Sequence, residues 1–352
     1  MLNRIHRTRA SLTGMMAVLT LSVAACGGDT GGSGNNADAE AAKESGLDQV
    51  TFQLNFVPGG FNAGFALARE KGYYEDEGLF VSIVPGNGSA TTAQLVASGN
   101  ADLAYADAVP VTQLVAKDAP MRVISTLYQS PPAQVTALAD SDIDSIDDLE
   151  GKKIATATGA AETPLLPLLL EANNIDPDSV DIAGTPKEAL VPQLLQENVD
   201  AILGSMDFYG IQLSDRDVET VDFPFYEHGV ATVSTSIVAS NSFLEERPDV
   251  AEGFVAASLK GWKEALEDPD AAIEALVTLF PDVDPEQAKK ELAATKELFC
   301  ANEAEYIGKA SPEAWERHQE VLESVGSLPK GVDPTNYYTY DYLPDDRELT
   351  TC

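Results

Sequence analysis

Short apolar runs and longer amphipathic stretches alternate along residues 50–240. The apolar runs, rich in β-branched and aromatic side chains, predict strands over 50–56, 80–84, 103–106, 153–157, 180–183 and 201–203. The amphipathic stretches between them predict helices over 63–71, 89–98, 163–173 and 187–196. This rhythm predicts an α/β fold, a mostly parallel sheet with helices on its faces. Ligands of such sheets bind at the carboxyl ends of the strands, beside helix N-termini.

The last third of the chain follows a different pattern. From residue 241 onward, apolar residues recur at helical spacing and predict helices over 248–267, 269–279 and 285–299. Another helix is expected to start at Ser311, with Ser311 as its cap and Pro312 at its first position. The α/β body therefore carries a helical C-terminal region.

An internal echo suggests that the body consists of two similar halves. Residues 93–102 (AQLVASGNAD) resemble residues 192–200 (PQLLQENVD), and Asp107 and Asp207 follow the two copies at a similar distance. Two like lobes facing each other would place both sets of strand-end loops across one cleft. The alternative is that any two strand–helix–strand units look this similar.

The N-terminus has the pattern of an export signal. Arg4, Arg7 and Arg9 precede an apolar stretch over 15–25, which is too short to span a bilayer as a mature helix. The small residues before Cys26 resemble a bacterial lipobox, which implies that Cys26 becomes the lipid-bearing first residue; the alternative is an ordinary signal with an incidental cysteine. Residues 27–47 are rich in Gly, Ser, Asn and Ala and predict a flexible tether.

Charge and composition exclude several classes of function. The 352 residues include 57 acidic and 22 basic side chains, a net charge of −35, which repels nucleic acid and anionic lipid. The acidity itself indicates solubility or salt adaptation. Three Cys and three His are too few and too scattered for a zinc framework. No Ser-His-Asp order, phosphate-binding loop or dinucleotide fingerprint occurs, so we expect no enzyme, no metal and no cofactor.

Four ordered segments carry a family resemblance. They are Asn55-Phe56-Val57-Pro58 through Gly78-Leu79, then 97–102 (ASGNAD), 147–154 (DDLEGKKI), and 313–315 (EAW) with 338–344 (YTYDYLP). The chain resembles solute-binding lipoproteins of ABC importers, in the family of thiamine-pyrimidine-precursor, riboflavin, sulfonate and nitrate binders. The segments span about residues 50–344 in family order.

This resemblance implies a two-lobed, type II periplasmic-binding-protein-like fold that closes on its ligand by hinge bending. The expected organisation is a signal peptide over 1–25, a lipid-anchored tether over 26–48, lobe one over 49–133 plus 236–352, and lobe two over 134–235. The chain is expected to cross between the lobes at 134–138 and to return at 229–239. The resemblance also implies a monomer on the extracytoplasmic face of the cell membrane, held only by its lipid, that delivers a small molecule to permease subunits. A ligand sensor with the same fold is the alternative.

Candidate ligand-binding residues lie at the predicted strand ends and helix starts. Phe56 is a candidate for stacking on a flat ligand or for core packing, Ser89 for anion binding or a simple cap, and Glu162 for ligand contact or a favourable first-turn acid. The full set is Asn55, Phe56, Asn62, Ser89, Thr91, Asp107, Tyr128, Gln129, Glu162, Thr163, Asp207, Phe208 and Glu227.

The charges in this set indicate the kind of ligand. Four acids, Asp107, Glu162, Asp207 and Glu227, face a single candidate base, Lys187. Phosphate esters usually need Arg or Lys clamps, so a neutral or amine-bearing heterocycle such as a pyrimidine or vitamin precursor is favoured. A sulfonate, taurine or nitrate held by helix amides stays an alternative.

Two departures bear on the resemblance. Thiamine-precursor relatives often carry a His where Asn62 stands, which puts a pyrimidine ligand in question. The related precursor-synthesising enzymes carry a Cys-rich motif, whereas this body has only Cys300 and Cys352. Outside the cell those two cysteines can form a disulfide, which would hold the C-terminal tail to the helical region.

Overall fold

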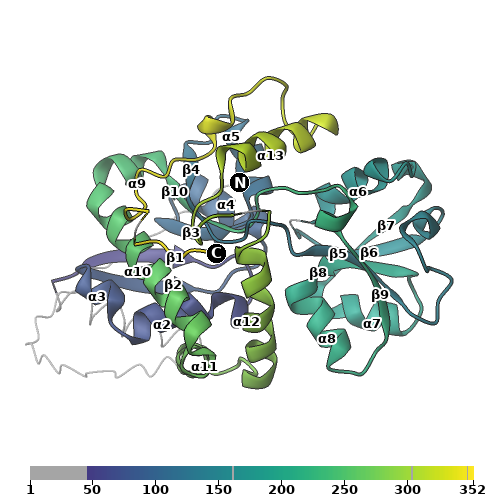
Figure 1. The fold of residues 1–352 in the computed structure, drawn as a ribbon, viewed down its shortest axis with the longest axis horizontal. Helices are drawn as coiled ribbons and strands as arrows, with labels where there is room; N and C mark the ends of the chain where they lie inside the picture. The colour runs from purple at the N-terminus through teal and green to yellow at the C-terminus, as the bar shows by residue number, and fades with distance from the viewer. Residues whose placement is uncertain (1–45, 161, 303, 347) are drawn as a thin grey trace, which may run out of the picture.

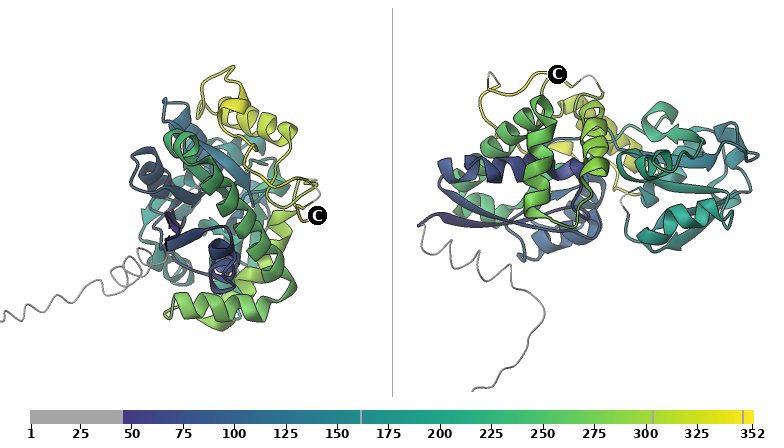
Figure 2. Two further views of the ribbon diagram at one scale, coloured as in Figure 1. Left: turned by 90° about the vertical axis from the view of Figure 1, so that its left-hand side faces the viewer. Right: turned by 90° about the horizontal axis from the view of Figure 1, so that it is seen from below.

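The computed structural model describes residues 46–160, 162–302, 304–346 and 348–352. The predicted signal peptide, most of the tether and Cys26 lie outside these residues. The described chain forms two lobes, each built around a five-stranded sheet (Figure 1), and the view from below in Figure 2 shows the lobes side by side. The predicted α/β, two-lobed fold with a helical C-terminal region is confirmed.

Lobe one holds the first sheet, with strand order β2-β1-β3-β10-β4. Strand β10 runs antiparallel to both neighbours, while β1 runs parallel to β2 and β3. The strands are β1 (Asp48–Gln53), β2 (Leu79–Val84), β3 (Leu103–Ala106), β4 (Met121–Thr126) and β10 (Ser236–Ser240). Its helices are α2 (Ala63–Glu70), α3 (Tyr73–Asp76), α4 (Ser89–Ala97), α5 (Ala108–Val115), α9 (Asn241–Glu246), α10 (Pro248–Glu267), α11 (Pro269–Leu279), α12 (Pro285–Phe299) and α13 (Pro312–Ser324), with short turns η1 (Gly60–Asn62) and η8 (Pro334–Asn336).

Lobe two holds the second sheet, with strand order β7-β6-β8-β5-β9. Here β5 is the antiparallel strand, between β8 and β9. The strands are β5 (Ala133–Leu138), β6 (Lys153–Ala157), β7 (Asp181–Thr185), β8 (Ala201–Ser205) and β9 (Thr220–Pro224). Its helices and turns are η2 (Ile146–Leu149), η3 (Thr163–Leu165), α6 (Leu166–Ala172), η4 (Pro177–Ser179), η5 (Lys187–Ala189), α7 (Leu190–Leu195), η6 (Met206–Gly210), α8 (Ile211–Ser214) and η7 (Phe225–His228).

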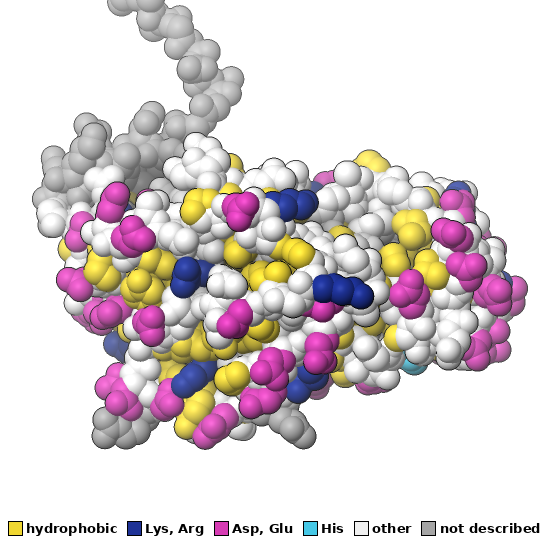
Figure 3. Space-filling view, turned by 90° about the horizontal axis from the view of Figure 1, so that it is seen from above, with side chains coloured by type: hydrophobic (Ala, Val, Ile, Leu, Met, Phe, Trp, Pro, Cys, Tyr) yellow, Lys and Arg dark blue, Asp and Glu magenta, His cyan; other side chains and the backbone are white. Residues whose placement is uncertain are grey.

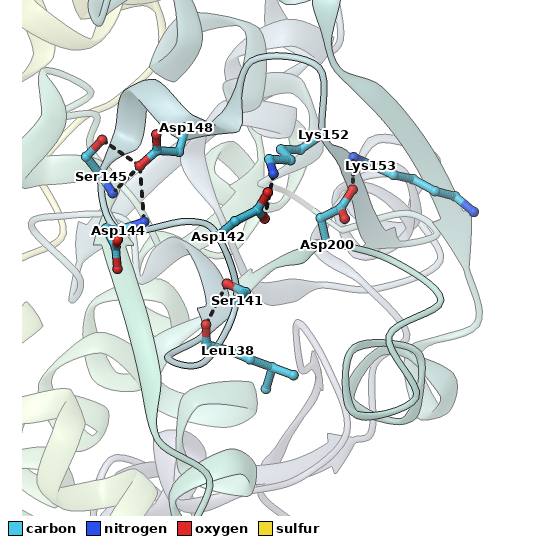
Figure 4. A network of polar contacts seen from close by, with 9 residues as sticks. All are labelled: Leu138, Ser141, Asp142, Asp144, Ser145, Asp148, Lys152, Lys153 and Asp200. Carbon is cyan, nitrogen blue, oxygen red and sulfur yellow. Dashed lines mark hydrogen bonds and ion pairs between the residues drawn. The ribbon is translucent and has the colours of Figure 1, made fainter.

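The two sheets repeat one plan, and the sequence echo has a structural cause. Strands β3 and β8, which follow the echo segments, occupy the middle of their sheets. Asp102 accepts a hydrogen bond from the backbone N–H of Thr51 at 2.8 Å, and Asp200 accepts one from the N–H of Lys153 at 2.7 Å (Figure 4). In each lobe the Asp that ends the repeated segment therefore hydrogen-bonds to the parallel strand beside the central strand, which is β1 in lobe one and β6 in lobe two.

The chain passes between the lobes at residues 127–132 and returns at 229–235. These two segments pair with each other, since the N–H groups of Leu127 and Tyr128 donate to the carbonyl of Thr235, and the N–H of Ser234 donates to the carbonyl of Tyr128. The expectation that 134–138 forms the crossing was wrong. Those residues belong to β5, which pairs along its whole length inside the second sheet and begins at Ala133.

The C-terminal helices pack onto lobe one and reach the lobe junction. Helix α10 lies against α2 so closely that a Cβ on Gly64 would meet the ring of Trp262 at 2.2 Å. Helix α12 stands at the junction in Figure 1, and its Lys290 forms an ion pair with Asp215 of lobe two. The structure joins Cys300, just after α12, to Cys352 in a disulfide with a Cα–Cα distance of 5.4 Å.

Two surface properties complete the description. Acidic side chains are scattered over the face of both lobes shown in Figure 3 and outnumber the basic ones. Within the described residues, no helix combines the length and apolar character needed to cross a membrane.

Candidate ligand-binding site

A cavity of about 320 Å³ lies between the lobes, at the size expected for a small-molecule site. Its walls are strand-end loops of both sheets together with the crossing segments. From lobe one and the crossings come Asn55, Phe56, Phe61, Asn87, Gly88, Ser89, Tyr105, Asp107, Tyr128, Pro131, Pro132 and Thr235. From lobe two come Ala157, Thr158, Gly159, Ala160, Glu162, Leu165, Pro186, Lys187, Glu188, Ser205, Asp207, Phe208 and Tyr209.

Two buried carboxylates, one from each lobe, are fixed by the crossing segments. Asp107 caps α5 through the N–H of Val109 at 2.8 Å and accepts the Ser234 hydroxyl at 2.6 Å. Asp207 accepts the Tyr128 hydroxyl at 2.8 Å. Because Ser234 and Tyr128 belong to the two crossings, the acids of the cavity and the hinge form one hydrogen-bonded unit.

The enclosed position of these acids changes their protonation. Burial raises the pKa of Asp107 to about 6, against the opposing hydrogen bonds from Ser234 and Val109. Burial also raises the pKa of Glu162 to about 7, and the charges of Asp107 and Asp207 add to the effect. The pKa of Asp207 is raised in the same direction by burial, opposed by its bond from Tyr128. The cavity thus holds acids that a cationic or hydrogen-donating ligand would stabilise in their charged form.

Aromatic and cationic contacts hold the lobes together over the cavity. The Phe208 ring of lobe two meets Phe56 edge-on at 5.5 Å and Phe61 at 6.1 Å. Lys187 of lobe two places its ammonium 4.9 Å from the centre of the Phe56 ring and donates to Asn87 at 3.1 Å. These contacts join the two lobes directly at the cavity.

Two further tyrosines line the cavity. Tyr105, in β3, is 1% exposed, and Tyr209, in η6, is 6% exposed. Neither hydroxyl has a hydrogen-bond partner among the described residues. Neither tyrosine was predicted from the sequence as a ligand-binding residue. Each lies two positions from a predicted acid, Asp107 or Asp207, and alternation along a strand would have flagged Tyr105.

The structure brings eight of the predicted residues to the cavity wall. They are Asn55, Phe56, Ser89, Asp107, Tyr128, Glu162, Asp207 and Phe208. Three others lie just behind the wall. Asn62 approaches Asn55 at 3.5 Å, Gln129 donates to the carbonyl of Thr126 at 3.1 Å, and Thr163 bonds Thr156 at 2.8 Å.

Two predicted residues do not line the cavity. Thr91 is exposed, because two positions along α4 from Ser89 turn a side chain to the far side of the helix. Its neighbour Thr92 is the buried one, and bonds the carbonyl of Leu54 at 2.8 Å. Glu227 is exposed in η7, which follows the edge strand β9 and does not reach the cavity.

The polar side chains of the cavity wall are carboxylates, hydroxyls, amides and one ammonium group. Within the described parts of the chain, no group of three or more His, Cys, Asp or Glu side chains is placed to hold a metal ion. The cavity wall contains Lys187 as its single cationic side chain among the described lining residues, and it contains no His or Cys.

Two similar α/β lobes that close on one polar cavity at their hinge define the periplasmic-binding-protein fold. Solved structures share it. The alkanesulfonate-binding protein SsuA from Xanthomonas axonopodis pv. citri matches with a TM-score of 0.67 and 15% identity, covering 83% of this chain and 98% of that one. The chain belongs to the NMT1/THI5-like family, whose model matches residues 62–272.

Proteins of similar sequence include both binding proteins and enzymes. A formylaminopyrimidine-binding protein of Halalkalibacterium halodurans is 28% identical over 68% of this chain and 72% of its own length. The riboflavin-binding protein RibY of Chloroflexus aurantiacus is 26% identical over 85% and 87%. A 4-amino-5-hydroxymethyl-2-methylpyrimidine phosphate synthase of Legionella pneumophila is 22% identical over 84% and 93%.

Proposed function

We propose that this protein is an extracytoplasmic solute-binding receptor of an ABC importer. It captures a small amine-bearing or neutral heterocycle, such as a pyrimidine or vitamin precursor, by closure of its lobes and delivers it to membrane permease subunits. The observation that carries the proposal is the cavity between the lobes, whose buried acids are hydrogen-bonded to the hinge itself. A ligand that contacts these acids contacts both lobes and is linked through the hydrogen bonds of the acids to both crossings.

The charge of the cavity favours this ligand class over anions. Asp107, Glu162 and Asp207 would repel a sulfonate, and Lys187 is already engaged with Phe56 and Asn87. The relatives named for a formylaminopyrimidine and for riboflavin are consistent with a nitrogen heterocycle. The sulfonate-binding neighbours share the fold at 15% identity, which supports the architecture and not the ligand.

A receptor is also favoured over a synthase of the same fold. The described cavity wall offers acids, hydroxyls, aromatic rings and one lysine, with neither His nor Cys among its side chains. A ligand sensor would use the same closure, and a permease that binds only the loaded form of this protein would separate a transport receptor from a sensor.

Calorimetric titration of the purified protein tests the ligand class. The panel holds formylaminopyrimidine, 4-amino-5-hydroxymethyl-2-methylpyrimidine, riboflavin, taurine, an alkanesulfonate and nitrate. We expect a heterocycle to bind and to lose at least tenfold in affinity in Asp107→Asn and Glu162→Gln, which keep the size of the side chain. Asp200→Asn, in the strand contact outside the cavity, is the matched control. Binding of a sulfonate with no effect of either acid variant would refute the proposal.

The membrane attachment is a separate part of the proposal. We propose that Cys26 is the lipid-bearing first residue of a mature monomer and that residues 27–47 form its tether. Mass spectrometry of the N-terminal peptide from membranes is expected to find a diacylglyceryl-modified Cys26. A terminus upstream of Cys26, or an unmodified one, would contradict it.

A further inference from the structure

Two buried tyrosine hydroxyls on opposite lobes have no internal partner at the cavity. Tyr105 and Tyr209 both line the cavity, and both oxygens are shielded from solvent without a hydrogen bond in the described structure. A buried hydroxyl left unpaired destabilises the fold, so a folded protein normally supplies a partner. The third tyrosine of the cavity, Tyr128, is paired with Asp207.

Both rings are held in place by packing. The Tyr105 ring packs edge-on against Phe65 at 5.0 Å and against Tyr128 at 6.5 Å. The Tyr209 ring packs edge-on against Phe208 at 5.0 Å, and its position requires Gly204, where a Cβ would lie 2.5 Å from the ring. Because packing fixes both rings, neither hydroxyl oxygen can reach another partner unless the whole side chain moves.

The surroundings determine what these hydroxyls offer. Burial and the nearby carboxylates Asp107 and Asp207 raise the pKa of Tyr105 well above its ordinary value. Burial and the charges of Glu162 and Glu188 raise the pKa of Tyr209. Both phenols stay protonated and are available as hydrogen-bond donors, while the neighbouring carboxylates are acceptors.

We propose that Tyr105 and Tyr209 determine specificity by donating, one from each lobe, to acceptor atoms of the ligand. This rests on the proposed function and narrows its ligand class. The ligand presents acceptors, such as a ring nitrogen or a carbonyl oxygen, to the two tyrosines and presents N–H donors to the carboxylates. An amine that has only donors can pair with the carboxylates but not with the tyrosines. A sulfonate that has only acceptors can pair with the tyrosines but not with the carboxylates.

The variants Tyr105→Phe and Tyr209→Phe test this because they remove one oxygen and keep the ring. With 4-amino-5-hydroxymethyl-2-methylpyrimidine, we expect each variant to bind about tenfold more weakly than wild type in calorimetry. Benzylamine, which has donors alone, is expected to bind wild type and both variants equally. An equal loss for both probes, or no loss for the pyrimidine, would overturn the proposal.

Unfolding of the ligand-free protein gives a second, independent readout. Without a partner to lose, Tyr105→Phe and Tyr209→Phe are expected to leave the melting temperature unchanged or to raise it. The control is Tyr74→Phe, because the buried Tyr74 hydroxyl pairs with Ser258 at 2.9 Å, and its loss is expected to lower the melting temperature.

The two readouts separate failure of this inference from failure of the proposed function. If neither pyrimidine, formylaminopyrimidine nor riboflavin binds wild type, the proposed ligand class fails, and the unfolding data decide on the tyrosines. Destabilisation by Tyr105→Phe and Tyr209→Phe as large as that by Tyr74→Phe would show that the hydroxyls have internal partners, and would overturn the inference.

Discussion

Glu291 is a buried acid whose protonation should make the stability of the empty protein fall as pH rises. It lies on α12, is 2% exposed, and accepts the N–H of Gly60 at 2.7 Å and the side-chain amide of Gln287 at 2.7 Å. Burial raises the pKa of Glu291 to about 7, against these two hydrogen bonds. The contact matters for the cavity because Gly60 begins η1, the turn that places Phe61 in the cavity wall.

The sign and size follow from linkage. A pKa raised from 4.5 to about 7 means that the folded state holds the proton more tightly than the unfolded state. The contribution is fully present below pH 4.5 and is lost as pH rises to about 7. At about 1.4 kcal/mol per pKa unit, the loss amounts to at most about 3 kcal/mol.

Glu291→Gln removes this dependence while keeping an acceptor for Gly60. Urea denaturation is expected to show equal stability of variant and wild type at pH 4, where the Glu291 carboxyl is largely protonated in both the folded and the unfolded state. At pH 8 the variant is expected to be more stable, by up to about 3 kcal/mol. A variant less stable than wild type at both values would refute the reasoning, because it would show that the charged carboxylate is favourable at this position.

Glu264→Gln is the control with the opposite sign. Glu264 pairs with Lys71 at 2.9 Å and accepts the Tyr73 hydroxyl, and these partners, led by Lys71, lower the pKa of Glu264. Its contribution is present at neutral pH and is lost as pH falls. We therefore expect Glu264→Gln to destabilise the protein at pH 8 and to have little effect near pH 3.

Two further variants test closure and the tail. Gly88 has φ +108°, and a Cβ there would lie 2.9 Å from the carbonyl oxygen of Gly159 in the other lobe. Gly88→Ala is therefore expected to weaken ligand binding at least tenfold. It is also expected to give a more open solution-scattering profile. Gly78→Ala, at φ +77° with open space around it, is expected to cost stability without changing affinity; equal affinity losses would contradict the closure argument. Reduction of the Cys300–Cys352 disulfide, which spans 52 positions, is expected to lower stability by about 4 kcal/mol, and an unchanged melting temperature in reductant would contradict this.

The fold was accessible from the sequence because its elements are locally encoded. The predicted helix over 248–267 matches α10, since its apolar spacing and the proline at its start define both the face and the boundary. The echo was also informative, since Asp102 and Asp200 are each fixed by the same strand contact in their lobe. The crossing was misplaced because a buried antiparallel strand such as β5 and an extended linker have the same composition.

The site was predicted less completely than the fold. Residues at strand ends, such as Phe56 and Asp207, were found because topology alone gathers strand ends at one edge. Thr91 failed because helix rotation decides which of two adjacent threonines turns inward. Tyr105 could have been predicted from its position two residues before Asp107 in an alternating strand. Tyr209, and the unpaired state of both hydroxyls, depend on three-dimensional packing that no local pattern records.

The bonds from Ser234 to Asp107 and from Tyr128 to Asp207 limit how this protein can change its ligand during evolution. Exchanging either acid for a base, as an anionic ligand would require, also removes an acceptor on which a crossing segment depends. A substitution that changes the charge of the cavity therefore also changes how the crossing segments are held. A second substitution would be needed to restore the lost hydrogen bond. Lineages with this hinge are expected to diversify most easily among ligands that differ in shape and keep the same charge.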